Sequence, residues 1–196
     1  MGSSQADKTA SHDRIVTAAA ARIRRGGIDA VKVSELMREA GLTHGGFYRH
    51  FGSRDDLIAE AVDAALKQGS RRTEDAASIG GIAALTAIID GYLSQAHRDK
   101  PEAGCAVGAL PADISRCGTR AREAYGRQVR RYIDLLGGLF KGAEPEDERD
   151  EAFLLLAALV GALAMARAVD EPELSDEILT RTARALHRHI PDPGRG

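Results

Sequence analysis

The chain has 196 residues, of which 43% are hydrophobic and 29% are charged, and its formal net charge is −2. This composition excludes an intrinsically disordered chain, and the length suffices to bury a core without disulfides or metal ions. The longest uninterrupted apolar run, residues 152–166, is shorter than the roughly 18 residues that a membrane-spanning helix needs, so we expect a soluble cytoplasmic protein.

Catalytic, metal-binding and export signals are missing from the sequence. Residues 1–6 lack the basic and apolar regions of a signal peptide, so we expect neither export nor an anchor. Cys105 and Cys117 are too few for a disulfide scaffold, and the six histidines do not combine with acidic residues at metal-ligand spacing. No phosphate-binding loop, dinucleotide motif or nucleophile motif occurs. The sequence therefore predicts no enzyme, no metal and no cofactor.

Basic residues are concentrated near the N-terminus. Residues 8–54 hold nine Lys and Arg against four acidic residues, a balance of +5, whereas residues 55–196 carry −6. A basic module on an acidic body suggests a head that binds a polyanion and a body with another task. A solvated charged face explains the same excess, so the motifs must decide between the two interpretations.

The sequence predicts helix almost throughout, because Ala, Leu, Arg and Glu dominate and no stretch alternates like a strand. We therefore expect an all-α protein. A first helix is predicted over residues 11–25, ending at Gly26-Gly27, and a second over residues 33–40, ending at Gly41. The apolar face of the first helix consists of Ile15, Ala19 and Ile23.

A very short third helix is predicted over residues 44–50, with Thr43 placed to cap it. Together with the second helix and the three-residue turn at 41–43 it makes a helix-turn-helix arrangement. Ser53, followed by Asp56 three residues later, begins a fourth helix with a sequence similar to a capping box. The apolar stripe of this fourth helix consists of Leu57, Ile58, Ala61, Val62, Ala65 and Leu66.

The third helix has two different faces. Phe47 and Phe51, four residues apart, share one face and are predicted to pack onto the first two helices. The opposite face consists of His44, Gly45, Tyr48 and Arg49. A phenol, a guanidinium and an imidazole on an exposed helix suit a phosphate-lined groove, where Tyr and Arg donate to phosphates and Arg also reads guanine. A glycine-weakened loop around a buried aromatic pair is the alternative interpretation.

The run from Ala40 to Leu57, AGLTHGGFYRHFGSRDDL, closely resembles the helix-turn-helix signature of TetR-family transcriptional regulators, and the resemblance extends over residues 10–66. It implies a three-helix DNA-binding head followed by a larger helical ligand-binding and dimerisation domain, about nine helices in all. The expected organisation is a flexible tail over residues 1–10, a helix-turn-helix domain over 11–52, an effector-binding and dimerisation domain over 53–190, and a flexible tail over 191–196.

The resemblance also assigns DNA contacts. Backbone phosphates would be contacted by Thr43, Tyr48, His50 and Arg54, and base edges would be faced by His44, Gly45 and Arg49. Lys32 stands where the family often has a threonine that caps the second helix, so a phosphate contact there would come from an ammonium group. Gly46 stands where a small hydroxyl residue is common, so one polar contact is lost.

Further helices are predicted near residues 79–97, 103–116, 119–141, 146–169 and 175–190. The run 152–166 is apolar all round, so its helix should be buried on most of its surface. By the resemblance it pairs with the last helix, and two such hairpins form a four-helix bundle between subunits. A central core helix of a monomer is the alternative. A homodimer would place two heads on half-sites about 34–36 Å apart in a near-palindromic operator.

In TetR-like proteins the middle helices enclose an effector pocket, whose occupancy changes the spacing of the two heads. The candidate lining residues here are Tyr92, Cys105, Tyr125, Tyr132 and Phe153, each of which is also explained as ordinary core or surface. The segment Gly104–Leu110 resembles a Gly-Cys stretch in a subset of the family. A thiol sensor at Cys105 and a buried, unreactive cysteine are both compatible with that stretch.

These observations predict a ligand-responsive transcriptional regulator. We expect a repressor that binds double-stranded DNA as a homodimer, is released by a small-molecule effector and has no membrane partner. The alternative is a helical interaction module whose basic head binds an acidic protein or a membrane surface. The first helix lacks the Trp, Phe and Leu content of an interfacial helix, which disfavours the membrane variant.

Overall fold

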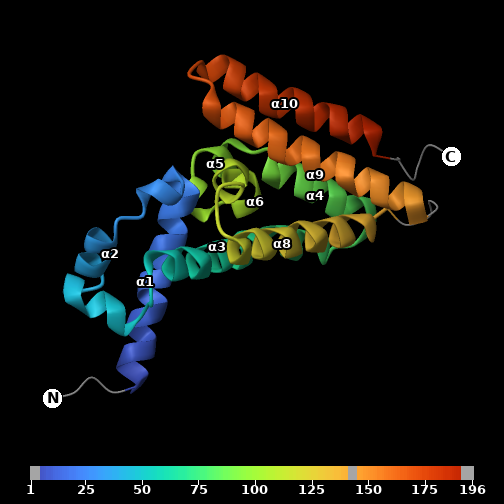
Figure 1. Cartoon of the computed structure of the whole chain (residues 1–196). Coiled ribbons are helices and arrows are strands. Elements are labelled where there is room, and N and C mark those ends of the chain that lie inside the picture. Colours follow the sequence, from blue (N-terminus) through green and yellow to red (C-terminus); the bar gives the residue numbers. More distant parts are fainter. Residues whose placement is uncertain (1–4, 141–144, 191–196) are drawn as a thin grey trace.

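The computed structural model describes residues 5–140 and 145–190, except for the side chains of His44 and Pro145 (Figure 1). The described residues form ten α-helices and three 3-10 helices, and no strand occurs among them. The predicted all-α class is therefore confirmed. Residues 1–4 and 191–196, which belong to the two predicted tails, lie outside the described part of the chain.

The head consists of α1 (Gln5–Gly26), the 3-10 helix η1 (Ile28–Ala30), α2 (Val33–Glu39) and the 3-10 helix η2 (His44–Arg49). The start of α1 differs from the prediction, because residues 5–10 continue the helix instead of forming a tail. The acidic Asp7 in the first turn favours this longer helix, since a carboxylate complements the partial positive charge of a helix N-terminus.

The body follows as α3 (Arg54–Ala77), α4 (Gly81–Tyr92), α5 (Gln95–Arg98), η3 (Pro101–Ala103), α6 (Ala106–Ala109), α7 (Pro111–Ile114), α8 (Thr119–Gly137), α9 (Pro145–Ala168) and α10 (Pro172–His189). Two predicted helices are each broken in two. The 79–97 helix is interrupted because the Ser94 hydroxyl accepts a hydrogen bond from the His97 amide at 3.1 Å and so starts α5. The 103–116 helix is interrupted where Pro111 begins α7.

One apolar core runs from the head into the body. The long helix α3 packs against α1 on the head side and against α8 on the body side, and α9 lies between α8 and α10 (Figure 1). Fully buried side chains mark this core along the chain: Ile15, Ile23, Leu36, Leu57, Leu85, Leu136 and Leu163. A displacement in the body can therefore reach the head through α1 and α3, since close-packed interiors transmit strain.

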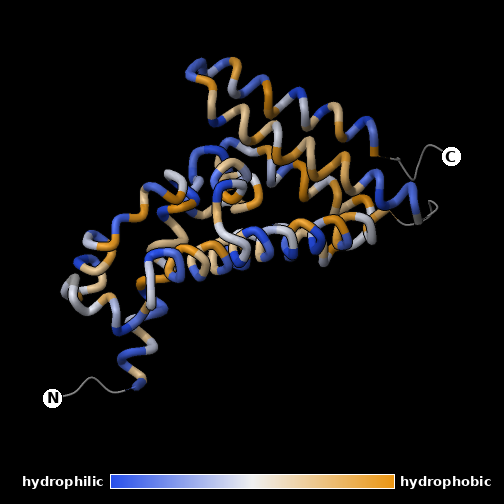
Figure 2. The backbone as a smooth tube through the Cα atoms, viewed as in Figure 1, coloured by the Kyte–Doolittle hydropathy of each residue, from blue (hydrophilic) through white to orange (hydrophobic). Residues whose placement is uncertain are grey.

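Helix α9 contains a long apolar stretch (Figure 2). The stretch Glu146–Ala168 is long and apolar enough to cross a membrane, contrary to the expectation from the shorter run at 152–166. A core helix passes the same test of length and composition, and α9 packs against α8 and α10, with Leu155, Leu159 and Leu163 buried. The helix thus belongs to the core of the body, with one side left exposed.

Candidate nucleic-acid interface

The turn of the helix-turn-helix depends on Gly41. Its φ of 72° lies in the left-handed region, where a Cβ would be strained, and the Leu42 amide donates to the Met37 carbonyl at 2.8 Å. This arrangement ends α2 and sends the chain directly into η2. The predicted stop at Gly41 is confirmed.

The recognition segment η2 is a 3-10 helix, whereas the sequence predicts an α-helix over residues 44–50. The Gly46 amide bonds to the Thr43 carbonyl at 2.9 Å, and the His50 amide bonds to the Phe47 carbonyl at 2.9 Å. Gly45 and Gly46 lower the helix propensity of this short segment, which explains the tighter form. Thr43 occupies the N-cap position, but its side chain makes no capping hydrogen bond among the described residues, so the predicted cap is wrong.

The inner face of η2 is buried as the spacing predicts. Phe47 and Phe51 are each 3% exposed, and their rings stack with centroids 5.4 Å apart. The ring of His12, from α1, stacks on the other side of Phe51 at 4.6 Å. Because Phe47 and Phe51 are packed into the core, the opposite face of η2 points outward.

The outer face of η2 is open to solvent. Tyr48 is 72% exposed, the highest value among the large hydrophobic and aromatic residues that the structure describes. Thr43, Gly45 and Arg49 are also exposed, and an added Cβ on Gly45 would meet nothing within 4 Å among the described atoms. The side chain of His44, a predicted base contact, lies outside the described part of the chain.

Of the other three predicted DNA contacts, Lys32 and Arg54 are engaged within the head, whereas Nδ1 of His50 is buried without a hydrogen-bond partner among the described residues. Lys32 is exposed, and its Nζ lies 3.7 Å from Oε1 of Glu35. Arg54 directs Nη2 to the Ile28 carbonyl at 3.1 Å and thereby ties α3 to η1. His50 is half-buried. Burial, and then the nearby charges of His12, Lys8 and Arg49, lower the pKa of its imidazole.

Two head residues were not among the predicted site residues but hold the interface in place. His12 bonds through Nε2 to Oε2 of Glu60 at 2.7 Å, joining α1 to α3 beside Phe51. Arg22 donates to Oε2 of Glu35 at 2.8 Å and also pairs with Glu39, joining α1 to α2. The hydrogen bond from Arg22 lowers the pKa of the Glu35 carboxyl. The sequence offered one signal for His12: its i, i+3 spacing to Ile15 places it on the buried face of α1.

Three of the five candidate effector residues lie together in the body. Tyr92 and Cys105 line a cavity of about 60 Å³ beside α3 and α4, and Sγ of Cys105 lies 3.6 Å from the hydroxyl of Tyr132. The Tyr92 hydroxyl is buried and has no hydrogen-bond partner among the described residues. Burial, and then the neighbouring Cys105, raise the pKa of both tyrosines.

His97 fixes the wall of this cavity. Its Nδ1 donates to the Tyr92 carbonyl at 2.8 Å, and its Nε2 accepts from the Cys105 amide at 3.0 Å, so the ring is the neutral Nδ1–H tautomer. Burial lowers the pKa of His97 to about 4. An added Cβ on Gly104 would come within 2.9 Å of Nε2, which explains a glycine at that position.

The other two candidates lie elsewhere. The Tyr125 hydroxyl donates to the Val107 carbonyl at 2.8 Å, and burial raises its pKa to about 12. Phe153 is 48% exposed on α9, with the guanidinium of Arg149 5.5 Å from its ring centroid. Neither residue lines the cavity beside Cys105.

Comparisons with known proteins agree with this geometry. Residues 15–61 match the family model described as bacterial regulatory proteins, tetR family. An uncharacterized HTH-type transcriptional regulator of Mycobacterium tuberculosis is 28% identical over 191 residues, covering 93% of this chain and 97% of that protein.

Solved structures share the fold. A TetR-family transcriptional regulator from Agrobacterium tumefaciens superposes with a TM-score of 0.78 at 18% identity, covering 94% of this chain and all of that one. The reduced form of E. coli NemR gives the same TM-score at 20% identity, covering 94% of this chain and 98% of that one. The matched residues 15–61 contain α2, η2 and the turn between them. Residues 15–61 therefore match the helix-turn-helix head of TetR-family transcriptional regulators, and the whole chain has the fold of TetR-family structures.

Proposed function

We propose that this regulator is a cytoplasmic repressor that binds a near-palindromic operator as a homodimer and is released by a small-molecule effector. The observation that carries the proposal is the outward face of η2, where Tyr48 and Arg49 are exposed while Phe47 and Phe51 are buried. A dimer on a promoter blocks polymerase without needing further contacts. Residues 11–52 form the DNA-binding domain of the proposal, and residues 53–190 form the effector-binding and dimerisation domain.

DNA binding is assigned to the exposed residues of the head. Arg49 and the backbone at Gly45 face base edges, and Thr43 and Tyr48 donate to phosphates. His44 keeps its predicted role at a base edge. Lys32, His50 and Arg54 are proposed as phosphate contacts at the margin, where Arg54 keeps further N–H donors besides the one that bonds to Ile28.

The exposed side of α9 supports the homodimer. Phe153, Leu154 and Met165 share one face of the helix and are 48%, 50% and 54% exposed, and Leu174 on α10 is 38% exposed. Exposed apolar side chains gathered on one surface mark interaction sites in soluble proteins. A second copy presenting the same face would bury them in a symmetric contact of four helices.

The cavity beside Cys105 supports the effector site. Tyr92 lines this cavity, and its buried hydroxyl has no hydrogen-bond partner among the described residues, which favours a ligand that accepts its hydrogen bond. At about 60 Å³ the cavity is far below the roughly 300–1,000 Å³ typical of ligand sites, so we infer that the bound state is more open. An effector that binds the open state more tightly would increase the population of that state and so change the spacing of the two heads. The coupling free energy between effector binding and DNA binding would be about 1–3 kcal/mol.

Fluorescence anisotropy with duplex DNA tests the proposal. Wild-type affinity should fall steeply with salt, because neutralised phosphates release counterions. Tyr48→Phe should weaken binding to every duplex by a similar factor of about 5, the value of one hydrogen bond near 1 kcal/mol. Arg49→Ala should mainly remove the preference for operator over random duplex. Salt-independent binding, or equal behaviour of both variants on all sequences, would contradict the assignment.

A further inference from the structure

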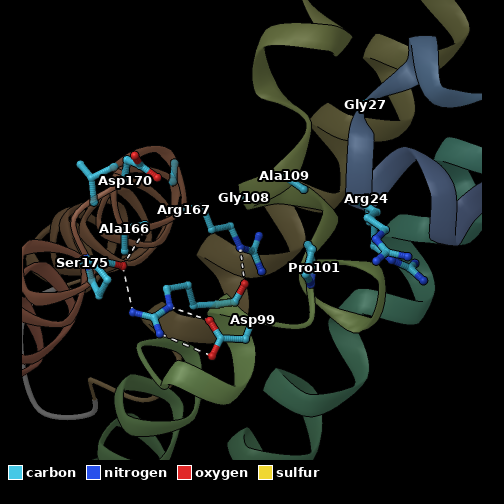
Figure 3. A pocket seen from close by; sticks show the side chains of 15 residues that line it. Arg24, Gly27, Asp99, Pro101, Gly108, Ala109, Ala166, Arg167, Asp170 and Ser175 are labelled. Carbon is cyan, nitrogen blue, oxygen red and sulfur yellow. Dashed lines mark hydrogen bonds and ion pairs between the residues drawn. The ribbon is translucent and has the colours of Figure 1, made fainter.

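A pocket of about 610 Å³ lies at the junction of head and body. Arg24, Arg25 and Gly27 line it from the end of α1, Ala109 lines it from α6, and Arg167 lines it from α9 (Figure 3). It shares no lining residue with the small cavity beside Cys105. Its volume is in the range of sites for small organic ligands.

Two arginines at this pocket are withdrawn from water without a carboxylate partner among the described residues. Arg24 is 7% exposed and donates to the Glu102 carbonyl at 2.7 Å, the Ala65 carbonyl at 3.2 Å and Oε1 of Gln68 at 3.1 Å. Arg167 is half-buried. All the hydrogen-bond acceptors of Arg24 are neutral, and Glu102 acts on its charge without a hydrogen bond to it.

Arg167 donates only to backbone carbonyls, those of His97 at 2.6 Å and Arg98 at 3.1 Å. Its Nη1 has no hydrogen-bond partner among the described residues. Burial lowers the pKa of both the Arg24 and the Arg167 guanidinium groups, which is the expected response of a cation removed from water. Asp99 and Glu102 act on the charge of Arg167 without direct contact. Buried charges are normally paired directly, so a guanidinium with a free N–H donor at an open pocket favours an anionic occupant.

The remaining charges of the lining reinforce this. Arg98 is paired with Asp99 at 2.7 Å and with Asp176 at 2.6 Å, so the two carboxylates more than balance its charge. Arg25 is exposed and makes no hydrogen bond or ion pair with the described residues. The lining as a whole holds more arginines than acids: Arg24, Arg25, Arg98 and Arg167 against Asp99 and Asp170. Figure 3 shows Arg167 and Asp99 on one side of Pro101 and Arg24 on the other.

Apart from Ser175, the uncharged part of the wall is apolar and small. It includes Pro101, Gly108, Ala109, Ala166, Val169 and Pro172. Such a wall accommodates a hydrocarbon or aromatic group, while Arg167 and Arg25 supply donors that suit a carboxylate or phosphate. We propose that this junction pocket binds a small organic anion, a carboxylate or phosphate ester, held by Arg167 and Arg25 and packed on the apolar wall. Because Arg25 belongs to the head and Arg167 to the body, such a ligand would bridge the two.

A matched pair of fluorescent probes tests the proposal without reference to DNA binding: 8-anilinonaphthalene-1-sulfonate and its neutral analogue N-phenyl-1-naphthylamine. The chain has no Trp to interfere. Affinity for the sulfonate should fall about tenfold in Arg167→Gln and in Arg25→Gln, and stay unchanged in Arg122→Gln, an exposed arginine outside the pocket. Affinity for the neutral amine should be the same in all three. Arg25→Gln keeps the test valid if loss of the Arg167 hydrogen bonds unfolds that variant.

Competition and sedimentation complete the test. Phenyl phosphate and benzoate should displace the sulfonate, whereas inorganic phosphate at equal concentration should not. Equal sulfonate affinity in the wild type and both pocket variants would overturn the proposal, as would equal displacement by inorganic phosphate. Variants that dimerise more weakly but keep their affinity for the probe would also overturn the proposal. In that case the negative charge opposite the arginines would come from the second copy of the chain. Each of these outcomes leaves the salt-dependent DNA binding of the head unaffected.

Discussion

Single residues in this regulator carry charges whose state is set by their surroundings. His97 is held neutral between the Tyr92 carbonyl and the Cys105 amide, beside the proposed effector cavity. Arg54 donates to the Ile28 carbonyl, although its position in the family motif predicts a contact with a DNA phosphate. The identity of such a residue indicates its chemistry, but its partners come from distant segments and are visible only in the fold.

The pKa of His97 predicts how stability depends on pH. Folding depresses this pKa from about 6.5 to about 4, so below pH 6.5 the unfolded chain binds a proton that the folded chain does not. The free energy of unfolding should therefore decrease as pH falls through this window, by about 2 kcal/mol between pH 7 and pH 5 from this residue. Urea unfolding at both values measures the decrease. His97→Gln should show a shallower dependence, and an identical slope would contradict the assignment.

At the scale of elements, the head follows from short-range signals. The stop at Gly41, the start at Ser53 and the buried pair Phe47 and Phe51 are local in sequence, and all were predicted correctly. Helix interruptions in the body were missed because the hydrogen bond from His97 to Ser94 competes with a continuous apolar pattern.

The parts of the site that were missed depend on contacts across the chain. His12 reaches Glu60, 48 residues away, and Arg22 reaches Glu35 and Glu39 on another helix. Periodicity places His12 on the buried face of α1 but does not say which residue it meets. For the same reason the outward position of Phe153 could not be predicted from a run that is apolar all round.

The caps of α3 and η2 make a matched pair for a stability measurement. The Ser53 hydroxyl accepts from the Asp56 amide at 3.1 Å and donates to its carboxylate at 2.9 Å, whereas the Thr43 side chain makes no cap contact among the described residues. Ser53→Ala should lower the free energy of unfolding by about 1 kcal/mol in urea titrations. Thr43→Ala should change it by less than about 0.5 kcal/mol. Equal losses of unfolding free energy in the two variants would contradict the capping role of Ser53.

At the scale of the whole molecule, the exposed apolar face of α9 is predicted to hold the dimer together. Leu154→Glu would place an unpaired carboxylate in the contact twice, so dimer affinity should fall at least about hundredfold in sedimentation equilibrium. Helical content by circular dichroism should stay unchanged, because Leu154 is 50% exposed in the single chain. Ile79→Glu is the control, since Ile79 is 61% exposed but lies between α3 and α4. A Leu154→Glu variant that remains dimeric would contradict this contact.

The central claim is that the outward face of η2 reads DNA twice, once from each subunit. Sequencing the genomic fragments retained by the purified chain, in parallel with Arg49→Ala, measures this most directly. The account predicts that wild-type fragments share an inverted repeat with half-sites one helical turn or a multiple of it apart, and that Arg49→Ala retains fragments without that repeat. Wild-type fragments with no common sequence, or the same repeat retained equally by Arg49→Ala, would contradict it.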